Sequence, residues 1–246
     1  MNDPETEFER ELVVFRNEVH EATQSFYAEQ TVHNVARSDV QVFQALNRHA
    51  AFWNLTTRAL QMNALIVLGR IFDEDPRSHG VRRLLCLAKT NSHIFSKVAL
   101  ERRKRPHAGA WTEEYMRDVY VPNPRDFVRL QRHTDRQRTI YRSKYKALRD
   151  KFVAHRDRAD VAALFVNARI PELEKLLRFL NALHDALWEL FANGRKPIFR
   201  PTRYSARQIL KLASSSRHSE AESEWITHET KKFLNYLREA AKHKIR

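Results

Sequence analysis

The sequence predicts an all-α protein, and three observations support this class. The 246 residues contain only four glycines and eight prolines, too few for the many tight turns of a β-sheet protein. The chain is rich in Leu, Ala, Arg, Glu and Lys, which favour helices. Apolar residues recur at intervals of three and four, the period of an amphipathic helix. With 42% apolar residues, the chain can build a core for one large domain or two small ones.

The N-terminal third predicts two long helices. Asp3 and Pro4 form a helix start, because Asp accepts from free backbone N–H groups and Pro fits the first helical position. A second helix is expected to begin at Ser38, to reach its most buried part in the apolar segment 64–68, and to end within residues 70–76. The first helix carries one apolar stripe, made of Phe8, Leu12, Phe15, Val19, Ala22 and Phe26.

The middle of the chain predicts short helices and then a long one. Residues 81–105 form two short helices that end in a basic run at 102–105, which is expected to lie in solvent. Residues 109–123 are expected to be irregular, with one helical turn within residues 111–120, and to lie outside the core bundle. Asn123 and Pro124 then give a strong start signal for a helix that runs to about His155.

Two more helices are predicted in the C-terminal part. Pro171 opens a Leu-rich amphipathic helix that Asn193 and Gly194 end. Ser219, with Glu222 as its capping-box partner, is expected to start the last helix. We therefore divide the chain into a helical bundle at 1–194 and a basic C-terminal extension at 195–246. The last helix carries a shorter apolar line, made of Ile226, Phe233, Leu237 and Ala240.

Cysteine usage and hydropathy predict a cytoplasmic protein. Cys86 is the single cysteine, so a disulfide framework or a thiolate-rich zinc site is excluded, and we expect this residue to be buried. The N-terminus lacks the cationic start and apolar run of a secretory signal. The most apolar segment, residues 59–72, is too short and too polar to span a bilayer, so no membrane association is expected.

The charge distribution predicts a polyanionic partner. The net charge is +14, and residues 125–158 alone hold twelve Lys and Arg against four Asp. The apolar stripe of this helix is narrow, so the helix must expose much of its surface or line a groove. Residues 195–219 contain seven Lys and Arg and no acid, which is typical of a linker or a partner-binding extension. Five prominent aromatics are expected in the core rather than as base-stacking platforms: Phe43, Phe52, Trp53, Phe72 and Trp188.

One Arg–His pair is singled out by its context rather than by its spacing. Four arginines are followed by a histidine after four or five intervening residues, about as many as chance would give in so basic a chain. Only Arg149, paired with His155, is followed by a small acid, Asp150, and only this pair ends the long basic helix. The other pairs lie in a basic loop, a packed helix and a terminus: Arg102 with His107, Arg178 with His184, and Arg238 with His243.

Arg149 and His155 are suited to RNA cleavage without a metal ion. His155 can move a proton between a ribose 2′-hydroxyl and the leaving 5′-oxygen. Arg149 can hold the non-bridging phosphate oxygens as charge develops, an effect worth ~3 kcal/mol per donor. Six helical steps place the two side chains about 120° apart, so one helix does not bring them together. A twofold dimer would, because it brings two copies of the pair into one cleft.

The segment Arg149–His155 resembles the Arg–polar–His motif of the HEPN superfamily of α-helical ribonucleases. Its flanks, including the segment that ends at Asp73, resemble the HEPN-like branch found in phage abortive-infection proteins of the AbiU type, over residues 5–193. The resemblance implies an antiparallel HEPN-type bundle, a homodimer with a composite site, and metal-independent endoribonuclease activity without a cofactor. It assigns the catalytic positions to Arg149 and His155 and an accessory position to Asp150, where many members have Asn. Asp73 is expected to be a structural partner of a basic side chain.

The resulting hypothesis is a toxin or antiphage effector that cuts RNA to 2′,3′-cyclic phosphate and 5′-hydroxyl ends. Two alternatives stay open. The chain could be a non-catalytic RNA- or protein-binding module, or a regulatory partner of a nucleotidyltransferase in a toxin–antitoxin operon. An antitoxin partner is expected in a toxin system. The residues expected to contact the RNA backbone are the cations around the motif: Arg142, Lys146, Lys151 and Arg156.

Overall fold

The computed structural model describes residues 3–105, 112–150, 170–198 and 217–243, and every regular element in these ranges is helical. The all-α prediction is therefore confirmed. Among the described residues, five helices have more than 20 residues: α1 (Pro4–Ser38), α3 (Ala50–Ile71), α7 (Pro124–Lys144), α10 (Ile170–Asn193) and α12 (Arg217–His243). The shorter elements are α2 (Val40–Arg48), α4 (Val81–Thr90), the 3₁₀ turn η1 (Ser92–Phe95), α5 (Lys97–Lys104), α6 (Thr112–Arg117) and α8 (Lys146–Arg149).

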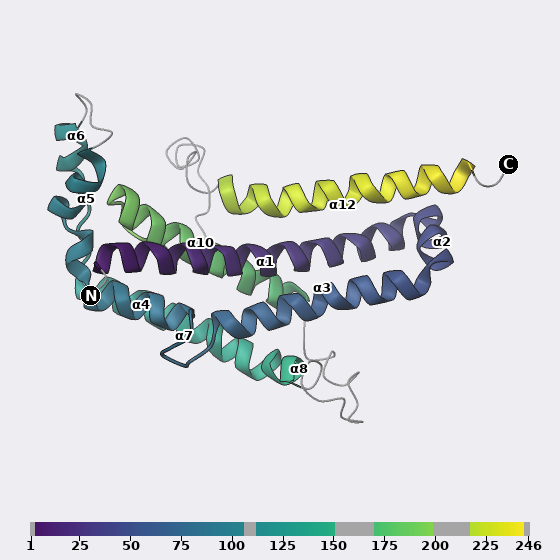
Figure 1. The fold of residues 1–246 in the computed structure, drawn as a ribbon, viewed down its shortest axis with the longest axis horizontal. Helices are drawn as coiled ribbons and strands as arrows, with labels where there is room; N and C mark the ends of the chain where they lie inside the picture. The colour runs from purple at the N-terminus through teal and green to yellow at the C-terminus, as the bar shows by residue number, and fades with distance from the viewer. Residues whose placement is uncertain (1–2, 106–111, 151–169, 199–216, 244–246) are drawn as a thin grey trace.

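Helix α1 is the centre of the bundle, and α3, α10, α12, α2 and α4 all pack against it. Figure 1 shows α3 running back alongside α1 from the turn at α2, with α12 on the other side of α1. Asp3 caps α1 by accepting from the backbone N–H of Thr6, as expected. The predicted apolar stripe of α1 is buried at every position. The core can therefore form around one helix whose stripe continues for most of its length.

The predicted second helix is two helices. A break at His49 separates α2 from α3, and Asp39, not Ser38, is the cap of α2. The Asp39 carboxylate accepts from the backbone N–H groups of Gln41 and Val42, whereas the Ser38 hydroxyl donates back to the Asn34 carbonyl. The break turns the chain so that the apolar C-terminal half of α3 returns to the core.

The predicted long basic helix is also interrupted. Asn123 and Asp126 form a capping box at the start of α7, as the start signal indicated. The helix ends at Tyr145, and the short helix α8 follows from Lys146. Tyr145, at the break, and Leu148, within α8, are both 1% exposed, so the chain stays against the core through the break. The rest of the predicted helix, to His155, lies outside the described residues.

Helices α4 and α5 confirm the two short helices, but two of their side chains differ from expectation. Cys86 is exposed, because it lies off the stripe by which α4 packs. Arg103 is not part of a solvated run. It pairs with Glu5, donates to the backbone carbonyls of Ile94 and Phe191, and stacks on the Phe191 ring at 4.2 Å. Arg103 thus joins α5 to the start of α1 and the end of α10.

The ends of α10 and α12 show one correct and one wrong boundary. Gly194 ends α10 with a φ of 56°, in the left-handed region where glycine is favoured. Helix α12 begins at Arg217, two residues before the predicted cap at Ser219. Among residues 224–240 of this helix, Leu234 is buried whereas Phe233 is exposed, and Leu234 joins Val32, Val42 and Leu46 in a small second core. The predicted division at residue 194 stays a prediction, although α12 packs on α1 and α2.

The core prediction for the five aromatics is correct only in part. Phe72 is buried, but Phe43, Phe52 and Trp188 are 52%, 61% and 40% exposed. In the described ranges, no helix combines the length and hydropathy that a membrane span requires.

Candidate functional site

Arg149 lies at the rim of the bundle, at the last position of α8. Leu148, the preceding residue, is buried in the core, whereas the Arg149 side chain is 30% exposed. The one-residue step from a core position to a rim position follows from the 100° rotation per residue of a helix. Arg149 is therefore anchored through its neighbour and keeps part of its guanidinium accessible.

The Arg149 side chain packs against the backbone of α3 at Gly69. A Cβ added at Gly69 would lie 2.5 Å from Nη1 of Arg149, 2.8 Å from its Cδ and 3.1 Å from the hydroxyl of Tyr141. Only glycine leaves this space free without moving those atoms. Gly69 interrupts an otherwise apolar helical run, a pattern that often marks close packing, but the sequence did not indicate what packs there.

Asp150 holds the outer edge of the Arg149 guanidinium. Nε and Nη2 of Arg149 both donate to Oδ1 of Asp150, at 2.8 and 2.5 Å, and Lys146 donates to Oδ2 at 3.0 Å. Burial tends to raise the pKa of Asp150, but these hydrogen bonds and charges lower it overall. Burial likewise lowers the pKa of Arg149, and hydrogen bonding to Asp150 raises it overall. Both groups are therefore charged at neutral pH.

Tyr141 also belongs to this site, and the sequence did not assign it a functional role. Its ring stacks on Phe72 with centroids 5.2 Å apart, and the side chain is 2% exposed. Its hydroxyl makes no geometrically sound hydrogen bond within the described part of the chain. Burial raises the pKa of Tyr141 to about 12, against the opposing effect of the Arg149 charge. The Tyr141 hydroxyl is therefore neutral at physiological pH. It lies close to the Arg149 side chain on the side that faces Gly69.

Of the other predicted site residues, the structure describes Arg142 and Lys146. Arg142 is half exposed and pairs with Glu74 at 3.3 Å, and Lys146 is half exposed beside Asp150. Exposed ion pairs of this kind contribute at most about 1 kcal/mol, so both cations can exchange partners. His155, Lys151 and Arg156 lie outside the described residues. The structure thus brings Arg149, Asp150 and Lys146 together and does not test the pairing of Arg149 with His155.

Two further expectations concern acids and metals. Asp73 accepts a hydrogen bond from the backbone N–H of Asp75 and is near enough to influence the pKa of Tyr141. No ion pair between Asp73 and a cation is found in the described ranges. Within these same ranges, no group of three or more His, Cys, Asp or Glu side chains is arranged to hold a metal ion.

Replacing Gly69 with Ala tests how closely α3 and α8 pack. Ala favours a helix by up to about 1 kcal/mol over Gly, but its Cβ must displace the Arg149 side chain. We expect the free energy of unfolding in urea to change by less than about 1 kcal/mol, while the NMR resonance of the Arg149 Nε–H group shifts. In the Gly69→Ala/Arg149→Ala double variant the Cβ meets no guanidinium, so the protein should be more stable than with Arg149→Ala alone. An unshifted Nε–H resonance in Gly69→Ala would contradict this packing.

The comparison with known families covers nearly the whole chain. The model of the AbiU2 family, a HEPN family, matches residues 5–238. The match continues beyond residue 193, where the resemblance seen in the sequence ended, and so includes most of α12. Comparisons with curated proteins and with solved structures gave no match. Because the family match spans far more than half of the sequence and the bundle is helical as that family requires, the chain belongs to the AbiU2 family of HEPN proteins.

Proposed function

We propose that the protein is a HEPN-type endoribonuclease that cuts RNA without a metal ion and acts as a toxin or antiphage effector. The observation that carries this proposal is the position of the Arg149 guanidinium. It packs over Gly69 beside the Tyr141 hydroxyl, and its Nε and Nη2 both donate to Asp150 at the partly exposed edge of the site. Membership of a HEPN family supports the same class of activity.

The contacts of Arg149 with Asp150 resemble those of an arginine with a phosphate. Nε and Nη2 form the edge with which a guanidinium binds a phosphate or a carboxylate. In the structure both converge on one carboxylate oxygen of Asp150. That oxygen occupies the place that a non-bridging phosphate oxygen would take. Asp150 therefore keeps the arginine in a binding orientation and also competes with the substrate for it.

His155 supplies the proton transfer in this proposal. It would accept the proton of the attacking 2′-hydroxyl or donate one to the leaving 5′-oxygen, while Arg149 stabilises the charge on the phosphate. A second copy of the chain would complete the site, because a twofold axis places two motifs in one cleft. Lys146 and Arg142, with Lys151 and Arg156, would attract the RNA backbone, so binding should weaken as salt rises.

One alternative is favoured by a specific observation. Asp150 and its partners form a closed ion-pair group in which Arg149 already has an anionic partner. Such a group would suit a protein that binds RNA or a protein partner without cutting RNA. An antitoxin or a nucleotidyltransferase partner is compatible with either function.

Expression in a bacterial host separates these functions. We expect the wild type to slow growth and fragment cellular RNA, and Arg149→Ala and His155→Ala to abolish both effects. Arg178→Ala is a matched control, because Arg178 also precedes a histidine by six positions but is 64% exposed on α10. It should be as toxic as the wild type. Equal toxicity of the wild type, Arg149→Ala and His155→Ala would exclude the catalytic function.

Replacing Asp150 with Asn tests its competition with the substrate. Asn can still accept a hydrogen bond from Arg149 but carries no charge. We expect RNA affinity, measured by fluorescence anisotropy in the His155→Ala background, to rise roughly 2- to 5-fold, in line with the up to about 1 kcal/mol of an exposed ion pair. Asp150→Ala serves as a comparison that also removes the acceptor. Weaker RNA binding by Asp150→Asn would show that the carboxylate does not compete with RNA.

A further inference from the structure

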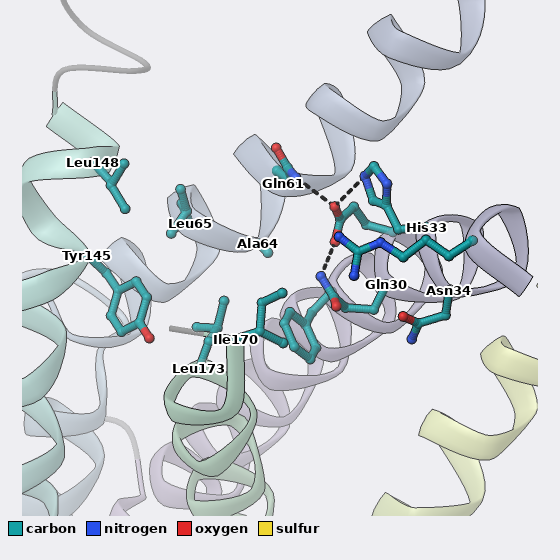
Figure 2. A pocket seen from close by; sticks show the side chains of 13 residues that line it. Gln30, His33, Asn34, Gln61, Ala64, Leu65, Tyr145, Leu148, Ile170 and Leu173 are labelled. Atoms are coloured by element: carbon teal, nitrogen blue, oxygen red, sulfur yellow. Dashed lines mark hydrogen bonds and ion pairs between the residues drawn. The ribbon is translucent and has the colours of Figure 1, made fainter. Parts of the chain in front are cut away.

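A mixed polar and apolar pocket lies beside α8, on a different side of that helix from the exposed edge of Arg149. Its walls come from α1, α3, α8 and the start of α10 (Figure 2). The cavity volume is about 330 Å³. This value is at the lower end of the range for small-molecule sites, about 300–1,000 Å³. The pocket therefore suits a ligand of the size of a single nucleotide rather than a longer polymer.

A buried carboxylate organises the polar end of the pocket. Glu29 is 3% exposed on its side chain and accepts from Nε2 of Gln61 at 2.6 Å, Nε2 of Gln30 at 2.6 Å and Nε2 of His33 at 3.0 Å. Figure 2 shows these three contacts as dashed lines. Because both amides must turn their N–H groups toward the carboxylate, their carbonyl oxygens point away from it. Both residues line the pocket, and each offers a carbonyl acceptor on the side away from Glu29.

The opposite end of the pocket is apolar and fixed. Phe26, Leu65, Tyr145 and Leu148 line it, and all four are buried members of the main core. Side chains packed in this way have little freedom, so the apolar wall is already formed. A flat, weakly polar group such as a nucleobase could lie against it.

Two basic side chains lie at the rim. His33 is half exposed, and its hydrogen bond to Glu29 raises its pKa. Arg37 follows one helical turn later, is exposed, and also lines the pocket. Arg37 makes the rim attractive to an anion such as a phosphate, and His33 adds to this attraction when it is protonated.

We propose that this pocket binds one nucleotide, with its base against the apolar wall and its phosphate near His33 and Arg37. The carbonyl oxygens of Gln30 and Gln61 accept from an exocyclic amino group, so adenine, cytosine and guanine are preferred over uracil. The same chemistry can be presented by one unstacked residue of an RNA substrate or by a free nucleotide. In the first case the proposal rests on the proposed ribonuclease function and adds a base preference to it.

Calorimetry with the full chain tests the pocket, using the four nucleoside 5′-monophosphates as probes and the His155→Ala background to prevent cleavage. We expect adenosine, cytidine and guanosine monophosphate to bind more tightly than uridine monophosphate. Arg37→Ala should weaken them about 10-fold, the effect of one charge-assisted hydrogen bond. Arg48→Ala is the matched control, because it removes an exposed arginine of the neighbouring helix that does not line the pocket. Gln61→Leu should reduce the difference between the bases.

Short single-stranded RNA distinguishes the two sources. If Arg37→Ala weakens RNA binding as well, the pocket holds a residue of the substrate. If only the monophosphates respond, the pocket holds a free nucleotide. If no monophosphate binds at millimolar concentration, or if Arg37→Ala and Arg48→Ala behave alike, the proposal is wrong. Because binding is measured without cleavage, this result does not depend on whether Arg149 and His155 are catalytic.

Discussion

The close approach of α3 and α8 at Gly69 is the constraint on which the candidate site depends. The Arg149 guanidinium fills the space where any other residue at position 69 would place its Cβ. This contact requires α8 to lie directly on α3, which in turn requires Tyr145 and Leu148 to be buried. Across the break between α7 and α8, the backbone N–H of Tyr145 donates to the carbonyl of Tyr141 and that of Arg149 to the carbonyl of Tyr145. The chain therefore stays against the core up to Arg149.

The same short helix links the two sites. One side of α8 faces the core and contributes Leu148 to the wall of the pocket, next to Tyr145 at the start of this helix. Another side presents Arg149 with its partner Asp150. A substrate that extended from the pocket to Arg149 would contact both sides of one rigid element. Tyr141 and Phe72 support this element from within the bundle, and the neutral Tyr141 hydroxyl adds no charge that would compete for the arginine.

Much of the fold could be predicted because its signals are local. Asp3, Asn123 and Gly194 mark helix ends through their own side chain or backbone preference, and the stripe of α1 is visible in its period. The breaks at His49 and Tyr145 could not be found in this way, since helix-forming residues continue on both sides and tertiary packing decides where the helix stops. The exposure of Phe52 depends on which elements pack opposite it. The spacing of apolar residues along the sequence does not show which elements these are.

The candidate site could be predicted only where its residues are neighbours in the sequence. Asp150 was singled out because it directly follows Arg149, and the structure places the two side chains in contact. Gly69 and Tyr141 are distant in sequence, and nothing in their own pattern connects them with Arg149. The pocket around Glu29 was missed for a similar reason. Its polar residues are spaced like an ordinary solvated helix face, and only the packing of α3 against α1 encloses them.

The central claim is that the planar edge of Arg149, held in place by α3, binds the phosphate of RNA during cleavage. The most direct measurement is the cleavage rate of purified wild type and Arg149→Lys on RNA in EDTA, with analysis of the product ends. Lys keeps the charge but lacks the planar edge. We expect the wild type to leave 2′,3′-cyclic phosphate and 5′-hydroxyl ends and Arg149→Lys to be slower by about 100-fold. Cleavage by Arg149→Lys at the wild-type rate, or different product ends, would contradict the account.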